Sequence, residues 1–251
     1  MNFIKQALQT FFKITPYQIK KRLPNITLDP VKLLMAYYLA TGESKTIVQI
    51  GACDGKSCDP LYRFLRTGKI KALLIEPMPG SHAQLIKNYA GVPNVAIIQA
   101  AISRTDGTMT MYSIRPGSKR GERDEGMLLA SFYKEHLIRY GVAEADILPT
   151  TVPSLSLQTL LTSQKIADID LLQIDTEGYD AEIVRMALDL PVLPKAINFE
   201  KKQLDTTTMA DVHDRLQQKG YLLVYDEMNT LAVLESVERA LSNLGQVQAG
   251  G

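Results

Sequence analysis

The chain is poor in several residues that mark particular protein classes. Its 251 residues include no tryptophan, two cysteines and three histidines, and the formal net charge is +1. Cys53 and Cys58 lie too close together to staple a fold, and the sequence offers no second Cys or His pair for zinc. A charge near neutrality gives no concentrated basic surface for nucleic acid. These absences argue against a disulfide scaffold, a zinc module and a nucleic-acid binder, and they favour a reducing, cytoplasmic location.

Long apolar runs are missing too. No stretch approaches the roughly 18 apolar residues of a membrane span. Lys5 and Lys13 interrupt the start of the chain, where a signal peptide would need an apolar core. Hydrophobic residues nevertheless make up 45% of the chain, which is enough for one large α/β domain with a buried core.

Residues 1–44 are predicted to form a helical extension of that domain. A first helix at 2–14 places Ile4, Leu8 and Phe11 on one face. This pattern indicates packing on the same domain or on a second copy of the chain, which would form a homodimer. A helix that lies on a membrane surface is the alternative.

A strand followed by a glycine loop organises the amino-terminal half. Residues 46–50 are a β-branched run typical of a buried strand, and Gly51 and Gly55 bracket the tight loop after it. Asp59 and Pro60 then supply a cap and a first-turn proline for a helix. Glycines let a ligand approach the backbone, and helix N-termini present free N–H groups. The unit therefore predicts a nucleotide-type ligand.

Glu76 ends the next predicted strand, residues 71–75. It follows the first glycine at close to the roughly 20-residue spacing of the acid that meets ribose in such folds. A carboxylate there accepts both hydroxyl protons and repels a 2′-phosphate. The small residues Ala100 and Ala101, after a third strand at 95–98, would let an adenine ring lie against the backbone. We therefore expect an adenosine-type ligand.

The loop also departs from two familiar phosphate-binding patterns. A P-loop needs four residues between its glycines and this loop has three, and the dinucleotide pattern lacks its middle and third glycines here. The remaining pattern suits S-adenosylmethionine, which carries a ribose but no pyrophosphate. A phosphotransferase with Lys56 and Ser57 on phosphates and Asp175 on Mg²⁺ is the alternative enzyme.

The middle of the chain contains an insertion. Residues 107–114 are predicted as a strand that continues the strand–helix alternation of a doubly wound sheet. The alternation then stops for residues 115–147, which begin as a polar, glycine-rich loop and continue as a helix at 131–140 capped by Ser131. An insertion of this length predicts a lid over the site. We expect it on the side where the molecule that accepts the methyl group of S-adenosylmethionine would bind.

Acidic residues crowd the chain after a buried strand at 171–174. Asp175 and Glu177 come first and are the functional candidates. Asp180 and Glu182 follow, and they fit the ordinary preference for acids at a helix start. Four acids beyond a central parallel strand stand where ligands bind in open α/β sheets.

A further carboxylate, Glu200, ends a predicted strand at 196–199 and should reach the same edge of the sheet. A later helix is expected to carry His213 on its surface. Residues 221–225 and 230–234 predict a closing hairpin.

Several short motifs occur in a specific order along the chain. They are Ile50-Gly-Ala-Cys-Asp-Gly-Lys-Ser57, Ile75-Glu-Pro-Met-Pro79, Ala100-Ala-Ile-Ser103, Val152-Pro-Ser-Leu-Ser-Leu157, Ile169-Asp-Leu-Leu-Gln-Ile-Asp-Thr-Glu-Gly178 and Ile197-Asn-Phe-Glu200. Over roughly residues 45–235 the chain thereby resembles the FkbM family of S-adenosylmethionine-dependent methyltransferases. The resemblance implies an α/β, class I (Rossmann-like) fold over residues 45–240, with a seven-stranded, mostly parallel sheet and helices on both faces. It also implies O-methylation of a hydroxyl on a sugar, glycan or other small-molecule natural product.

The resemblance further implies which residues bind the cofactor. They are Gln49, Gly51, Ala52, Asp54, Gly55, Ser57, Glu76, Pro77, Ala100, Ala101 and Asp175. Gln49 stands where class I enzymes often have an acid. It can hydrogen-bond the methionine end of the cofactor but cannot pair with the ammonium as a charge. A catalytically silent partner subunit with the same fold is therefore a further alternative.

Methyl transfer to a hydroxyl needs assistance, because the hydroxyl keeps its proton at neutral pH. Asp175 and Glu177 are the candidate bases, and His136 of the insertion is a third. Asp175 with Glu200 would alternatively hold Mg²⁺, which lowers the acceptor's pKa. The sequence does not decide whether a general base or a metal ion activates the hydroxyl. Residues 241–251 are expected to be a flexible tail.

Overall fold

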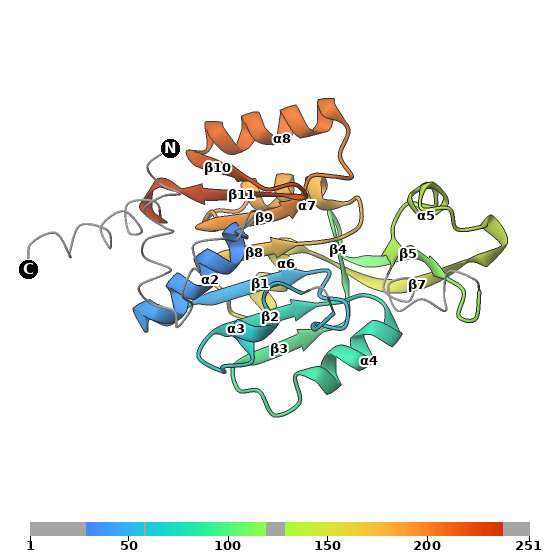
Figure 1. Cartoon of the computed structure of the whole chain (residues 1–251), viewed down its shortest axis with the longest axis horizontal. Helices are drawn as coiled ribbons and strands as arrows, with labels where there is room; N and C mark the ends of the chain where they lie inside the picture. Colours follow the sequence, from blue (N-terminus) through green and yellow to red (C-terminus); the bar gives the residue numbers. More distant parts are fainter. Residues whose placement is uncertain (1–28, 58, 119–128, 238–251) are drawn as a thin grey trace, which may run out of the picture.

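The computed structural model describes residues 29–57, 59–118 and 129–237. Figure 1 shows a large sheet with helices around it and a smaller sheet that extends to one side. The helix predicted at 2–14, the homodimer contact expected there and the tail at 241–251 lie outside the described residues. Among the described helices, none combines the length and the apolar character needed to cross a membrane.

The large sheet has seven strands in the order β10-β11-β9-β8-β1-β2-β3. The strands are β1 (Thr46–Ile50), β2 (Lys71–Ile75), β3 (Val95–Ile98), β8 (Leu171–Ile174), β9 (Ala196–Glu200), β10 (Tyr221–Tyr225) and β11 (Asn229–Leu234). Neighbouring strands pair in parallel except at β11, which runs antiparallel to both β9 and β10. This mostly parallel sheet confirms the expected fold class, and β1, β2 and β3 have the predicted bounds.

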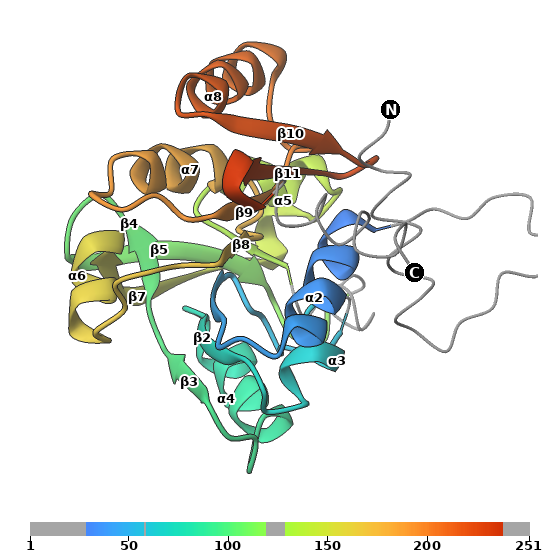
Figure 2. The same cartoon turned by 90° about the vertical axis from the view of Figure 1, so that its left-hand side faces the viewer.

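Alternate side chains of the central strands face two different layers of helices. Ile47 packs with the layer of α2 (Pro30–Thr41), α3 (Tyr62–Leu65) and α4 (Pro79–Asn88). Val48 and Ile50 pack with the layer of α6 (Leu157–Ser163), α7 (Asp180–Leu188) and α8 (Thr206–Gln218). Figure 2 shows α2 and α3 on one side of the sheet and α6 and α7 on the other. Both faces of the sheet are thus covered, and its strand ends are left for a ligand.

The smaller sheet has the order β4-β7-β5-β6. Its strands are β4 (Ala101–Ser103), β5 (Gly107–Ile114), β6 (Ala130–Ser131) and β7 (Ile147–Ser156), and α5 (Lys134–Arg139) and a 3₁₀ turn at Glu144–Asp146 complete it. We call this unit the arm. Its outer part has a small core of its own, made by Ile114, Leu137, Val142 and Ile147.

The arm corrects two predictions. Residues 107–114 do form a strand, but β5 pairs with β7 inside the arm and does not continue the main sheet. The helix predicted at 131–140 begins only at Lys134, because Ser131 belongs to β6 and pairs with Tyr112 of β5. The long strand β7 is an addition that the sequence patterns did not predict.

His213 is a further correction. It lies on α8 as predicted, but it is half-buried and not fully exposed on the surface of the helix. Its ring centroid lies 5.3 Å from that of Tyr225 and 6.3 Å from that of Phe199, so the imidazole packs between helix and sheet.

Candidate functional site

The carboxyl ends of β1, β2 and β8 open into a cavity of about 220 Å³ that the arm walls on one side. Predicted site residues that line it are Gly51, Ser57, Glu76, Pro77, Ala100, Ala101, Asp175 and Glu177. The sequence patterns did not predict the other lining residues, which are Ile50, Cys53, Ile102, Met111, Leu129, Ala130, Phe132, Thr176 and Ile183. The polar lining comes from the main domain, and the arm contributes an apolar wall.

Gly51 brings two loops into direct contact. Its φ is +80°, in the left-handed region that favours glycine. A methyl group at this position would lie 1.7 Å from the carbonyl oxygen of Asp175. The N–H groups of Gly51 and Ala52 both donate to the carbonyl of Ile75, each at 3.0 Å. The loop after β1 is therefore pinned to the ends of β2 and β8.

Asp54 and Gly55, two other predicted residues of this loop, determine its shape. Asp54 accepts hydrogen bonds from the N–H groups of Lys56 (2.9 Å) and Ser57 (2.8 Å), and from the Ser57 hydroxyl (2.7 Å). Burial opposes ionisation of Asp54, but these hydrogen bonds hold its pKa below the ordinary value. A side chain at Gly55, whose φ is +67°, would collide with Leu85 of α4 and with Tyr89, the residue that caps α4. Asp54 and Gly55 therefore shape the loop and do not line the cavity.

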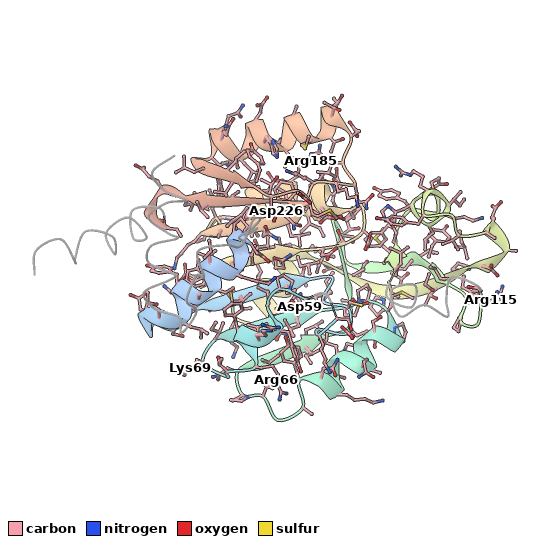
Figure 3. The ribbon with its side chains drawn as sticks, in the orientation of Figure 1. Asp59, Arg66, Lys69, Arg115, Arg185 and Asp226 are labelled. Carbon is pink, nitrogen blue, oxygen red and sulfur yellow. The ribbon has the colours of Figure 1, made fainter. Side chains whose placement is uncertain are left out.

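Gln49 and Ala52 also lie outside the cavity lining. Ala52 is buried in the core on the α2–α4 face. Gln49 is 4% exposed, and its amide is next to Asp59, a buried carboxyl whose pKa rises to about 6 through desolvation. Figure 3 shows Asp59 near the middle of the main body. Gln49 is thus buried next to Asp59, which the sequence predicted only as a helix cap.

Glu76 is held by the two loops that meet at the cavity. Its Oε2 accepts a hydrogen bond from the N–H of Cys53, and its Oε1 accepts one from the N–H of Met78, both at 2.8 Å. Burial raises the pKa of Glu76 to about 7 in spite of these donors. Each oxygen keeps a lone pair free, because a carboxylate oxygen can accept two hydrogen bonds. The carboxylate is thus fixed in place and able to receive two hydroxyl donors from a ligand.

Asp175 lies at the same edge of the sheet, directly after β8. Its side chain lines the cavity and is exposed to it, while the protein around the cavity desolvates the carboxylate. This burial, followed by the charges of Asp180, Glu177 and Glu200, raises the pKa of Asp175 well above the ordinary value. No described residue hydrogen-bonds to its carboxylate, so a cationic ligand group would be the natural partner.

Asp180 differs from its prediction as an ordinary helix-start acid. It is fully buried, and its Oδ2 accepts hydrogen bonds from the Thr176 hydroxyl (2.8 Å), the Thr176 N–H (3.3 Å) and the Gly178 N–H (3.4 Å). Its Oδ1 accepts one from the N–H of Glu200 at 3.2 Å. Asp180 therefore ties the loop after β8 to the end of β9. Glu182 does fit a structural role, since it pairs with Arg104 (2.6 Å) and Arg185.

Glu177 and His136 meet although they come from different units. His136 Nε2 lies 2.9 Å from Glu177 Oε2, and the His136 side chain is almost completely buried. The Ser131 hydroxyl donates to the carbonyl of Glu177 at 2.7 Å. The structure thus joins two of the predicted catalytic residues into one pair and adds Ser131, which the sequence analysis had assigned to a helix cap.

Glu200 lies near this group without lining the cavity. Burial, together with the neighbouring charges of Glu177 and Asp180, raises the pKa of Glu200 to about 7. Gln203 donates to the hydroxyl of Tyr140, which brings the end of α5 close to the same strand end. Within residues 29–57, 59–118 and 129–237, no group of three or more His, Cys, Asp or Glu side chains is arranged to hold a metal ion. The expected Mg²⁺ alternative at Asp175 and Glu200 gains no support from this arrangement.

Arg115, at the start of the predicted lid, lies far out on the arm in Figure 3. Its guanidinium donates to the carbonyl of Ala145 at 3.3 Å, and its N–H donates to the carbonyl of Asp146 at 2.7 Å. Residues 119–128 of the predicted lid lie outside the described residues. The described residues of the insertion that line the cavity are Leu129, Ala130 and Phe132.

The sequence matches the family model of the methyltransferase FkbM domain over residues 49–223. No curated protein sequence gives a significant match. Solved structures similar to this chain include the S-adenosylhomocysteine-bound Podospora anserina methyltransferase PaMTH1. That structure is 13% identical with a TM-score of 0.43, and the match covers 92% of this chain and 87% of that one.

The solved structures similar to this chain also include two that contain a bound cofactor. The cofactor-bound protein Rv0187 from MTB is 12% identical with a TM-score of 0.42, over 93% of this chain and 90% of that one. Fibrillarin from Aeropyrum pernix with bound S-adenosyl-L-methionine is 9% identical with a TM-score of 0.41, over 76% and 67%.

Proposed function

Because the chain belongs to the FkbM methyltransferase family, we propose that it transfers a methyl group from S-adenosylmethionine to a hydroxyl of a small-molecule or glycan acceptor. The observation that carries the proposal is the placement of Glu76. Its carboxylate lies in the cavity at the end of β2, and both oxygens are oriented by loop N–H groups. Such an acid recognises the two hydroxyls of a ribose.

The cavity residues suit the three parts of this cofactor. Glu76 would accept hydrogen bonds from the ribose hydroxyls. The small residues Ala100 and Ala101, with Pro77, leave space for a planar adenine ring against backbone. Asp175 would pair with the positive charge at the methionine end, which compensates for the neutral Gln49. Bound S-adenosylmethionine would supply a methyl group that its sulfonium activates for transfer.

The chain's own contribution to the reaction would be positioning and proton removal. Much of the catalysis in such a displacement comes from alignment of the acceptor oxygen, which the residues that line the cavity would provide. His136 holds Oε2 of Glu177, so Oε1 is the oxygen that would accept the acceptor's hydroxyl proton. The apolar arm residues Met111, Ala130 and Phe132 would exclude water from this end.

A product assay tests the proposal. The chain is incubated with S-adenosylmethionine and panels of hydroxyl-bearing glycans and natural products, and mass spectrometry searches for an acceptor that has gained one methyl group. We expect a methyl ether together with an equal amount of S-adenosylhomocysteine. Methylation of a nitrogen or carbon atom instead, or turnover that persists in Glu177→Gln, would contradict the assigned hydroxyl chemistry.

A further inference from the structure

Glu177 holds an uncommon backbone conformation at the cavity. Its φ is +52°, in the left-handed region that non-glycine residues rarely adopt, and Gly178 follows with φ +109°. Such a conformation persists only where the surrounding contacts hold it, and it is often found at functional sites. Since Glu177 also lines the cavity, the contacts that hold it decide where its carboxylate points.

Contacts from two sides hold this loop. From the main domain, Asp180 accepts hydrogen bonds from Thr176 and Gly178, the residues on either side of Glu177. From the arm, the Ser131 hydroxyl reaches the carbonyl of Glu177 at 2.7 Å, and His136 Nε2 reaches its carboxylate at 2.9 Å. The arm therefore grips both the backbone and the side chain of this one residue.

The Ser131 hydroxyl has a defined direction. It is 0% exposed, and its oxygen accepts a hydrogen bond from the N–H of Tyr133 at 3.1 Å. Its single proton is therefore committed to the Glu177 carbonyl. Water cannot readily replace this donor, because the side chain is sealed between β6 and the loop after β8. Loss of the hydroxyl would leave the left-handed turn without its hydrogen bond from the arm.

We propose that Ser131 is a positioning residue which, together with His136, forms a clamp from the arm that fixes Glu177 in its left-handed conformation and directs its carboxylate into the cavity. The part that Glu177 plays as a base rests on the proposed function. The clamp itself is a property of the fold, and it can be measured without an acceptor.

Histidine NMR gives a readout that packing alone would not move. The chain has three histidines, so the ¹⁵N signals of the His136 ring can be assigned with few variants. Ser131→Ala removes the clamp hydroxyl, and Glu177→Gln supplies the reference signals of a disturbed pair. The matched control is Ser103→Ala. Ser103 is also buried in the arm, at 4% exposure, and its hydroxyl donates to the carbonyl of Thr105 at 2.6 Å, away from Glu177.

In Ser131→Ala we expect the His136 ring signals to move away from the wild-type positions and toward those of Glu177→Gln. Amide hydrogen exchange at Thr176 and Gly178 should become about tenfold faster, which corresponds to the loss of one hydrogen bond. Ser131→Cys, whose thiol is a weaker donor, should give smaller changes of the same sign. Ser103→Ala should leave both measurements unchanged.

His136 signals at their wild-type positions in Ser131→Ala, with only a lower melting temperature, would overturn the clamp and leave Ser131 a packing role. If Ser131→Ala does not fold, the same two measurements on Ser131→Cys decide the question. Calorimetry with S-adenosylmethionine on the same samples separates the two proposals. A wild-type chain that fails to bind the cofactor would contradict the proposed function, whereas the NMR result would still decide the clamp.

Discussion

The two ends of the cavity are built in different ways. At the end formed by the loops after β1 and β2, backbone groups set the geometry: Gly51 lies against the backbone of Asp175 after β8, and Glu76 is oriented by two N–H donors. At the end formed by the loop after β8 and the arm, side chains far apart in sequence meet, as His136 and Glu177 do. Under the proposed function, the first end would hold the cofactor, and the second would hold the acceptor in a geometry that depends on how the arm packs against the main domain.

The largest effect is expected from Gly51→Ala, because the added methyl group would lie 1.7 Å from the Asp175 carbonyl oxygen and the backbone would be strained at φ +80°. We expect S-adenosylmethionine affinity to fall by at least about 100-fold, since the two loops must separate. Gly80→Ala is the matched control, because a methyl group there meets nothing within 4 Å. Calorimetry should find its affinity unchanged. Equal affinities in the two variants would refute the close backbone approach.

Glu76→Gln should have the next largest effect. The change keeps the shape but removes the charge that strengthens hydrogen bonds from the ribose hydroxyls, so affinity should weaken by about 10- to 100-fold. Glu182→Gln, which alters a carboxylate paired with Arg104 and Arg185, is the control and should bind normally. Circular dichroism should show both variants folded. An unaltered affinity in Glu76→Gln would remove this residue from the cofactor site.

The affinity for S-adenosylmethionine should also depend on pH, through the protonation of Glu76. The pKa of Glu76 is raised to about 7, so the neutral acid predominates below that pH and the carboxylate above it. Ribose hydroxyls bind the carboxylate better, and affinity should therefore rise by up to about tenfold from pH 6 to pH 8. Asp175, whose pKa is also raised, would add a change of the same sign. The slope should become shallower in Glu76→Gln, and an identical slope there would contradict the assignment.

The smallest effect on the cofactor is expected from Glu177→Gln. Glu177 belongs to the arm-held end, so S-adenosylmethionine affinity should stay within about twofold of wild type, while methyl transfer should fall by about 100-fold or more through loss of the base. Calorimetry and the product assay measure the two quantities on one sample. A large loss of cofactor affinity would show that the two ends are not separate.

The sequence predicted the strands that lead to Gly51 and Glu76 well, because local patterns build them. The β-branched run before Gly51 gave β1 with its bounds, and Glu76 follows its strand at the spacing that the fold imposes. Even in this region, the roles of two residues became clear only from the structure. Asp54 and Gly55 shape the loop from below, and neither could be separated from a lining residue by spacing alone.

The arm was harder to predict because its pairing is non-local. Strand β7 contains Pro149 and Pro153, which argue against a strand in a sequence pattern. Both are accommodated opposite β5, at Tyr112 and Thr108. Serine is a common residue at a helix N-cap, yet the Ser131 hydroxyl donates a hydrogen bond to the carbonyl of Glu177, which lies far away in the sequence. Only tertiary packing decides between a local and a distant partner for such a side chain.

One calorimetric experiment tests the central claim most directly: titration of the wild-type chain with S-adenosylmethionine and, separately, with ATP and Mg²⁺. The account predicts that one S-adenosylmethionine binds per chain and that ATP gives no binding heat, because the loop after β1 is too short to cradle phosphates and Glu76 is placed for ribose. Binding of Mg²⁺–ATP without binding of S-adenosylmethionine would contradict it.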